Sequence, residues 1–443
     1  MLGPEKLHGI AEQALTYTRA DQAEVLIMAT STALTRFANS RIHQNVAERN
    51  LQVRVRAVLG KKVGVASVNS LDRSSLQRAA ERAVEIAHVQ PENPDLQSLP
   101  VPLPIPATPE PSSSVANPQQ RARAVGTICR LAATHALVAS GAYTASQSEL
   151  LVSNSLGVRA YATRCDNELT TVIMSDDSSG YASSLHLDAA QVNAEAVAQE
   201  AVDKALRSRH PIAVPSGDYT VILEEHAVVD LIAYLSYLGF GATAVHEGRS
   251  FMAGRFGEKI TGEAISVWDD GLDPSGLPMP FDFEGVPKQR VDLIRDGVAV
   301  GVVYDTSTAA KDERQSTGHA LPAPNSMGPF ATNLFMGIGQ ASKEAMLASI
   351  DRGLWVTRFH YVNPVHPLQT ILTGMTRDGT FLIENGELTS GVKNLRFTQN
   401  MLQALAKTRH VGRTSCLARG FVGGIRAPAL CLESFAFTGA TEF

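Results

Sequence analysis

A proline-rich stretch at residues 90–120, QPENPDLQSLPVPLPIPATPEPSSSVANPQQ, constrains the fold of this chain more than any other feature. Proline fixes φ and removes a backbone N–H, so prolines at this density exclude helix and sheet interiors and favour extended segments. We therefore expect residues 91–117 to link a unit at 1–90 to a second unit at 118–212. A later break, HPIAVPSGD, predicts a third domain at 218–443.

The hydrophobic patterns on either side of the linker predict a mixed architecture. The stretch NLQVRVRAV alternates apolar and polar residues, which is typical of a strand, and SLDRSSLQRAAERAVEIAHV has helical spacing behind an Asp72 or Ser70 cap. In the third domain, short apolar segments are separated by glycine and proline, and hairpins are expected to turn at Asp296-Gly297 and Asn385-Gly386. We predict an α+β fold with two small α/β units followed by a large, mostly antiparallel β domain.

Charge and hydropathy exclude several classes of partner. The net charge of −5 and the scattered basic residues argue against nucleic acid, and no window reaches 18 uninterrupted apolar residues, which argues against a membrane span. The first 21 residues lack the basic and apolar regions of a signal peptide. Four widely spaced cysteines form no CxxC pair and are expected to be reduced thiols, which indicates the cytoplasm.

A His–Glu pair, His246 and Glu247, raises the question of a zinc peptidase. Such enzymes place two histidines on one helical face, with a glutamate between them as general base. Here the positions four and five residues after His246 are Ser250 and Phe251, which do not bind zinc in this way. The following glycines disfavour a helix, so a loop-exposed pair is the preferred interpretation, with both residues kept as weak metal candidates.

Longer segments of the chain carry a family resemblance. In order, they are LTRFANSRIHQNV, GRSFMAGRFGEKI, DDGLDPSGLPMPFDFEGVPKQRVDLIRDGVAVGVVYD, STGHA, TGMTRDGTFLIENGE and VKNLRF. Together they resemble the TldD/PmbA family over nearly the whole chain. The resemblance implies two branches: TldD is a zinc metallopeptidase with HExxxH on a helix, and TldE (PmbA) lacks this motif and pairs with TldD.

The resemblance places the position of the zinc motif on the segment AYLSYL. Ala233, Tyr234 and Leu238 stand where the family has the first histidine, the glutamate and the second histidine. The surrounding helix has a buried apolar stripe, and its lone Asp230 is not enough to hold a metal. The catalytic branch also has a cysteine ligand near its C-terminus. Cys416 lies near that place without the surrounding motif, so it is either a weak metal candidate or a small apolar filler.

The resemblance therefore implies a TldE-like, non-catalytic subunit of a heterodimeric zinc metallopeptidase, a hydrolase complex. We expect no cofactor in this chain and zinc in a TldD-like partner. The substrate would be an unfolded peptide or a small peptide-like molecule, including a natural product, since 29 arginines against 10 lysines fit a high-GC bacterial source. The alternatives are a self-sufficient hydrolase that is a homodimer when alone, and a peptide-binding module without catalysis.

The STGHA segment is the first of two polar stretches with open interpretations. Its hydroxyls, backbone N–H groups and imidazole are suited to contact a peptide or the partner subunit, and the alternative is a structural turn. The residues concerned are Ser316, Thr317, Gly318 and His319.

The second polar stretch is an acidic loop within residues 269–284. Close carboxylates can bind a cation or perform acid–base chemistry, whereas glycine- and proline-rich acidic loops are usually solvated. The loop has no EF-hand spacing. The carboxylates considered for such a role are those of Asp269, Asp270, Asp282 and Glu284.

Overall fold

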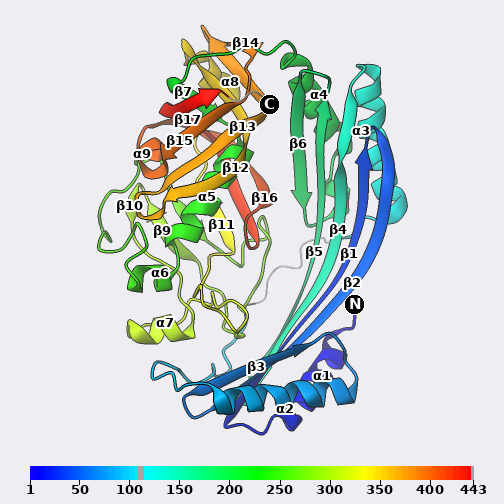
Figure 1. The fold of residues 1–443 in the computed structure, drawn as a ribbon, viewed down its shortest axis with the longest axis vertical. Coiled ribbons are helices and arrows are strands. Elements are labelled where there is room, and N and C mark those ends of the chain that lie inside the picture. Colours follow the sequence, from blue (N-terminus) through cyan, green and yellow to red (C-terminus); the bar gives the residue numbers. More distant parts are fainter. Residues whose placement is uncertain (107–113, 441–443) are drawn as a thin grey trace.

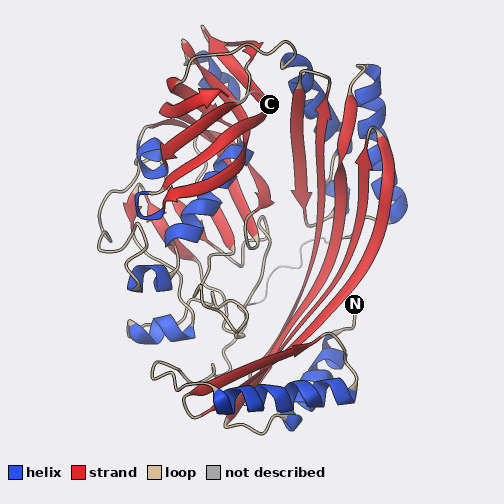
Figure 2. Cartoon of the chain, in the orientation of Figure 1, coloured by secondary structure: helices blue, strands red, loops and turns tan. Residues whose placement is uncertain are grey.

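The computed structural model describes residues 1–106 and 114–440. These residues form two layers, a long N-terminal sheet and a C-terminal β domain that lies against its upper half (Figure 1). Helices lie mainly on the outer surfaces and at the ends of the strands (Figure 2). The α-helices are α1 (Pro4–Tyr17), α2 (Arg73–Val89), α3 (Pro118–Thr134), α4 (Ala194–Arg207), α5 (Glu225–Gly239), α6 (Ala242–His246), α7 (Thr306–Lys311), α8 (Lys343–Ala348) and α9 (Met401–Ala406).

The N-terminal sheet joins the two units that the sequence predicts. Its order is β3-β2-β1-β4-β5-β6, and every neighbouring pair is antiparallel. β1 belongs to the first unit and β4 to the second, so their long pairing makes one continuous sheet across the linker. The strands are β1 (Gln22–Ala38), β2 (Arg41–Leu59), β3 (Lys62–Val68), β4 (Val138–Asn154), β5 (Arg159–Met174) and β6 (Ser179–His186).

The two halves of this sheet share one local plan, three strands followed by a helix that packs on the last strand. A glycine permits close approach in each half. A Cβ at Gly64 on β3 would lie 2.0 Å from the carbonyl oxygen of Ala83 in α2, and a Cβ at Gly180 on β6 would lie 2.2 Å from that of Ala201 in α4. The edge strands are therefore covered closely by backbone, which requires glycine at both positions.

The described part of the proline-rich linker contains no helix and no strand other than an isolated bridge at Ser114. Its first half is fixed to the sheet, because Gln22 accepts a hydrogen bond from the backbone N–H of Leu99 and Asn154 donates one to the carbonyl of Pro100. The middle of the predicted linker, residues 107–113, lies outside the described residues.

The C-terminal domain contains a mixed, mostly antiparallel sheet, which confirms the predicted fold class. β7 pairs with β12 in parallel and with β17 in antiparallel fashion, so the path β7-β12-β13-β15-β17 closes on itself. These five strands are called the barrel below. The strands are β7 (Gly217–Leu223), β8 (Val267–Asp269), β9 (Val291–Arg295), β10 (Val298–Ala299), β11 (Asn333–Met336), β12 (Arg352–His366), β13 (Ile371–Glu384), β14 (Glu387–Gly391), β15 (Leu395–Asn400), β16 (Thr408–Arg419) and β17 (Gly424–Ala440).

Local signals in the sequence agree with this structure. Asp72 caps α2 by accepting a hydrogen bond from the N–H of Ser75. Both predicted hairpin turns are present, with positive φ at Asp296 and Gly297 between β9 and β10, and again at the Asn385-Gly386 turn between β13 and β14.

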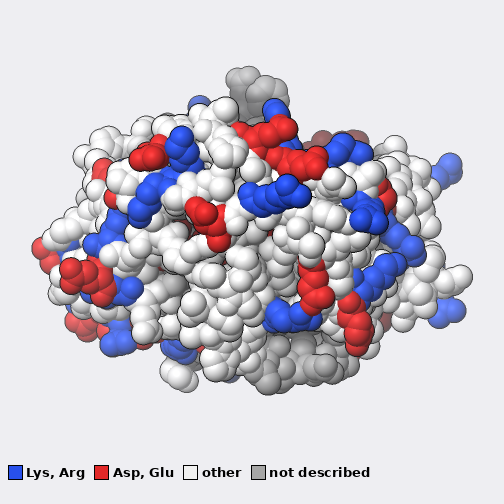
Figure 3. Space-filling model, turned by 90° about the horizontal axis from the view of Figure 1, so that it is seen from below, with Lys and Arg blue, Asp and Glu red and all other residues white. Residues whose placement is uncertain are grey.

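The distribution of charge on the surface and the hydropathy of the helices bear on the classes of partner that composition argues against. Seen from below, acidic and basic side chains of the described residues are interspersed on the molecular surface (Figure 3). None of the described helices combines the length and hydropathy that a membrane-spanning helix needs.

Candidate functional site

Helix α5, which carries the segment aligned with the zinc motif, lies against the barrel strands β12 and β17 and beside β16 (Figure 1). Its apolar residues occur at helical spacing, and Leu231, Ile232 and Leu235 are fully buried in the C-terminal core. The helix ends at Gly239, where a Cβ would lie 2.4 Å from the ring of Phe251. This packing fixes both the position and the end of α5.

The motif positions themselves are occupied by packed, non-ligating side chains. Ala233 and Leu238 are only 7% and 5% exposed and carry no metal-binding atom. The hydroxyl of Tyr234 donates a hydrogen bond to the carbonyl oxygen of Val362 on β12. The ring of Phe421, from the turn between β16 and β17, lies 5.0 Å from the Tyr234 ring in an edge-to-face arrangement. These residues do not fit a zinc ion.

Two ionisable side chains, those of His226 and Asp230, lie in the first turns of α5. Burial raises the pKa of Asp230 to about 7, against the opposing effects of the Arg358 guanidinium and the backbone N–H of Phe359. Burial, together with the nearby Lys204 cation, lowers the pKa of His226 to about 4, so this imidazole is neutral at pH 7. A carboxyl group that titrates near neutrality is suited to acid–base chemistry.

A chain of polar contacts connects this helix face to the N-terminal sheet. Tyr181 on β6 meets the His226 ring edge-to-face at 5.1 Å, and the guanidinium of Arg358 stacks over Tyr181 at 4.4 Å. Arg358 also donates hydrogen bonds to Asp378 on β13, which in turn accepts one from Ser179 Oγ at 2.8 Å. The two layers therefore meet through an ordered polar network.

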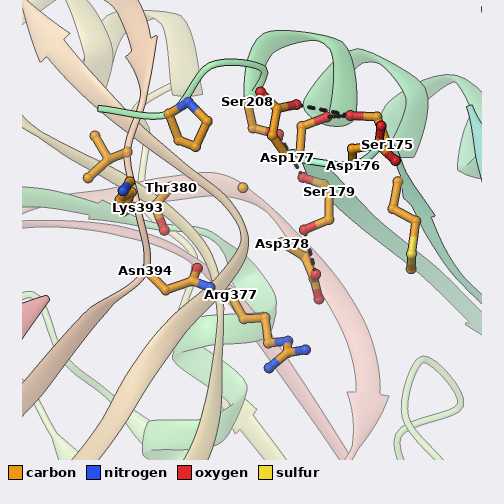
Figure 4. Close-up of a pocket in the computed structure, with 15 residues that line it drawn as sticks. Ser175, Asp176, Asp177, Ser179, Ser208, Arg377, Asp378, Thr380, Lys393 and Asn394 are labelled. Carbon is orange, nitrogen blue, oxygen red and sulfur yellow. Dashed lines mark hydrogen bonds between the residues drawn. The ribbon is translucent and has the colours of Figure 1, made fainter. Parts of the chain in front are cut away.

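A polar pocket of about 420 Å³ opens at the end of this network (Figure 4). One wall is the turn between β5 and β6, with Asp176 and Asp177, and the opposite wall contains Arg377 on β13 and Lys393. Figure 4 shows Ser179 and Asp378 pointing toward one another across the pocket, with the hydrogen bond between them. Carboxylates, hydroxyls and cations in one pocket can bind both donors and acceptors of a polar ligand.

A buried ionic cluster beside His226 also links the two layers. Lys204 of α4 lies 2.6 Å from Glu224, the residue that precedes α5, and 2.6 Å from Glu200. The second carboxylate oxygen of Glu224 accepts a hydrogen bond from the indole N–H of Trp355. Burial is the largest single effect and opposes ionisation of Glu224, but the Lys204 and Lys343 cations and the hydrogen bonds from Lys204 and Trp355 together lower its pKa.

The STGHA stretch is a tightly packed turn in the structure. Both ring nitrogens of His319 are engaged, Nε2 with Asp269 at 2.8 Å and Nδ1 with the hydroxyl of Thr317 at 2.9 Å, and the side chain is fully buried. A Cβ at Gly318 would lie 2.4 Å from the carbonyl oxygen of Pro287. His319 therefore acts in packing here, whereas contact of the half-buried Ser316 and Thr317 with a peptide or partner stays a prediction.

The solvated interpretation of the acidic loop is wrong for two of its carboxylates. Asp269 and Asp282 are fully buried. Asp282 accepts hydrogen bonds from the backbone N–H groups of Glu284, Val286 and Ala320, which close the loop and tie it to the segment after the STGHA turn.

The weak metal candidates lie in separate environments. His246 Nε2 lies 2.8 Å from Asp312, and Glu247 pairs with Arg249. Cys416 lies on β16 where the carboxylate of Glu225 acts on its thiol, and burial, reinforced by that carboxylate, raises its pKa to about 12. Within residues 1–106 and 114–440, no group of three or more His, Cys, Asp and Glu side chains is arranged to hold a metal ion.

Phe421 is one of several residues of the candidate site that the sequence interpretation missed. It follows β16 in the segment ARGFVGG, and its ring is 54% exposed although it also packs on α5. A large aromatic residue between glycines at a strand end was the only available signal, and its contact with a helix nearly 200 residues earlier is not encoded locally.

Comparison with protein-family models decides the family. Residues 216–439 match the PmbA/TldA metallopeptidase C-terminal domain, and residues 23–87 match domain 1 of the same family. The chain belongs to the TldD/PmbA family. The C-terminal match contains α5, the barrel strands and the STGHA turn, and the N-terminal match covers β1 to α2.

Individual family members resemble the chain over most of its length. It is 25% identical to a protein named metalloprotease TldD homolog from Haemophilus influenzae over 395 residues, which cover 83% of this chain and 80% of the relative. Among solved structures, TldE from Thermococcus kodakarensis superposes with a TM-score of 0.88 at 22% identity, covering 98% of this chain and all of that one. A Thermotoga maritima protein gives a TM-score of 0.85 at 20% identity, with 98% and 100% coverage. The structural likenesses show a shared fold.

Proposed function

We propose that this chain is the TldE-like, non-catalytic subunit of a heterodimeric TldD/TldE-type zinc metallopeptidase. The observation that carries the proposal is the packed motif on α5, where Ala233 and Leu238 offer no ligand and Tyr234 is held by Val362 and Phe421. The fold shared with a TldE protein supports the same branch. Zinc, its ligands and the general base would all belong to a TldD-like partner chain.

The substrate in this proposal is an unfolded peptide or a small peptide-like molecule. The polar pocket between Asp177, Asp378 and Lys393 supports this class, because it offers hydrogen-bond donors and acceptors side by side. The chain would complete a cleft with its partner in the cytoplasm and take no part in bond cleavage. No cofactor is assigned to the chain itself.

Mixing the purified chain with a TldD-like partner tests this role. Peptidase activity on an unstructured fluorogenic peptide is expected only in the mixture, rising until the two chains are equimolar. A partner whose HExxxH glutamate is replaced by glutamine should abolish turnover in the same mixture, since this residue is the general base. Equal turnover by this chain alone and by the mixture would contradict the proposal.

One observation favours a second candidate, a self-sufficient hydrolase. Asp230 has a pKa of about 7 on the helix face that carries the zinc motif in TldD proteins, and such a carboxyl group can act as general acid or base. This alternative predicts metal-independent hydrolysis by the lone chain that is lost in Asp230→Asn. An inert lone chain that binds peptide in every mixture without turnover would instead indicate a binding module.

A further inference from the structure

A second pocket, of about 460 Å³, lies at the lower end of the molecule, away from α5. One side is formed by β2, β3 and α2 of the N-terminal layer, and the other by the loops on either side of α7. In Figure 1 these elements face each other below the barrel. The volume suits a small organic molecule.

The two ends of this pocket differ in character. Its wall contains apolar side chains from both layers, including Val63, Val65, Ile86 and Leu321. Its polar end contains the guanidinium of Arg56 and two carboxylates, those of Glu284 and Asp305. An apolar wall with a charged end is the arrangement that binds an amphipathic small molecule.

The polar end has more negative than positive groups. Arg56 Nη1 lies 3.1 Å from Glu284, and Arg56 Nε lies 3.8 Å from Glu24 on the adjacent strand β1. Asp282 also acts on this guanidinium, and the Asp305 carboxylate lies close enough to Glu284 for their charges to interact. Burial, with a further contribution from Glu284, raises the pKa of Glu24 to about 7 against the effect of Arg56, which means that the carboxylate is incompletely compensated.

Several buried polar atoms at this end have no hydrogen-bond partner among the described residues. They are Glu24 Oε2, Arg56 Nε, Glu284 Oε2 and Thr306 Oγ1, and the last three belong to residues that line the pocket. Buried polar atoms in folded proteins are normally paired, so a group of such atoms beside a cavity indicates a ligand with complementary atoms. Two of these four atoms are carboxylate oxygens, which require a donor.

From this geometry we propose that the pocket binds a small organic cation with a primary ammonium head and an apolar stem. The ammonium group would donate hydrogen bonds to Glu284 and Asp305, and the stem would lie along Val63, Val65 and Leu321. A metal ion fits less well, because the described residues offer no group of three suitable ligands. The site does not depend on the metallopeptidase role.

Calorimetric titration of the full-length chain with hexylammonium tests the proposal. We expect saturable binding, and at least about tenfold weaker binding of hexan-1-ol, which has the same stem but no charge. Equal affinity for the two probes, or no binding of either, would overturn the proposal. The variants described next distinguish binding in this pocket from binding of hexylammonium at an adventitious surface site.

Two variants distinguish the contribution of the Glu284 charge from that of the pocket volume. Glu284→Gln keeps an acceptor for Arg56 and removes the charge, and is expected to weaken hexylammonium binding roughly tenfold. Ser307→Phe fills the pocket without changing a charge and should abolish binding even if Glu284→Gln fails to fold. Glu263→Gln, an exposed carboxylate outside the pocket, serves as the matched control. Unchanged affinity in both pocket variants would overturn the assignment.

Discussion

Replacing Lys204 with methionine is expected to lower the free energy of unfolding by about 3 kcal/mol, because it removes the one cation that hydrogen-bonds the buried Glu224 carboxylate among the described residues and leaves only the more distant charge of Lys343. Methionine retains most of the apolar stem of lysine, so the change removes mainly the charge. Lys204 is the only described group that pairs with Glu224 Oε2, whereas Glu224 Oε1 keeps its hydrogen bond from Trp355. Denaturant unfolding at pH 7 measures the effect.

The second carboxylate that pairs with Lys204 provides the control. Glu200 also lies 2.6 Å from Lys204, but its side chain is 49% exposed, so Glu200→Gln is expected to cost less than about 0.5 kcal/mol. Combining Lys204→Met with Glu224→Gln should recover part of the loss, since only the half-exposed Glu200 carboxylate then remains without Lys204. If Lys204→Met were as stable as Glu200→Gln, the pair would not hold the two layers together.

The second large effect is a change in the pH dependence of stability in Asp230→Asn. Burial raises the pKa of Asp230 to about 7, so the folded state keeps a proton that the unfolded chain releases near its ordinary pKa. The stability that this carboxyl group contributes is therefore fully present below about pH 4 and is lost as the pH rises through about 7. Asparagine does not ionise and avoids this loss.

The difference in unfolding free energy between Asp230→Asn and the wild type should therefore shift in favour of the variant by roughly 2–4 kcal/mol between about pH 4 and pH 8. Thermal or denaturant unfolding across this range measures it. Tyr237→Phe, on the exposed side of the same helix, removes a polar atom without removing a carboxylate and should follow the wild-type profile. A constant difference across the range would show that Asp230 ionises normally.

Local features of the fold were predictable from the sequence because their causes are local. The capping aspartate Asp72 and the turns at Asp296-Gly297 and Asn385-Gly386 depend only on neighbouring backbone geometry. The amphipathic pattern of α5 likewise predicted its buried face, because the core that it meets is apolar over the whole stripe.

Pairings between distant segments were not predictable in this way. The proline-rich linker separates β1 from β4 in sequence, and no local signal states that they pair in one sheet. The closure of the barrel through β7, which pairs with both β12 and β17, is similarly non-local. The register between strands depends on how side chains pack in three dimensions. A hydrophobic pattern limits the possible registers but does not select one of them.

The candidate site shows the same difference between features with local causes and contacts between distant segments. The absence of metal ligands at Ala233 and Leu238 was readable from the sequence once the family resemblance gave the alignment. The aromatic contact of Phe421 with Tyr234 and the burial of His319 against Asp269 required the structure, because they join segments that are far apart in the chain. The sequence therefore favoured a solvated acidic loop and left the STGHA stretch open between a contact site and a structural turn, whereas the fold buries Asp269, Asp282 and His319.

The most direct test of the central claim is the zinc content of the purified chain, alone and in complex with a TldD-like partner. Elemental analysis after expression with zinc in the medium is expected to find no stoichiometric metal in the lone chain and about one zinc ion per heterodimer, held by the partner's motif. Stoichiometric zinc in the lone chain would contradict the assignment of α5 as a packed, non-ligating helix, and His246, Glu247 and Cys416 would then be the first residues to replace.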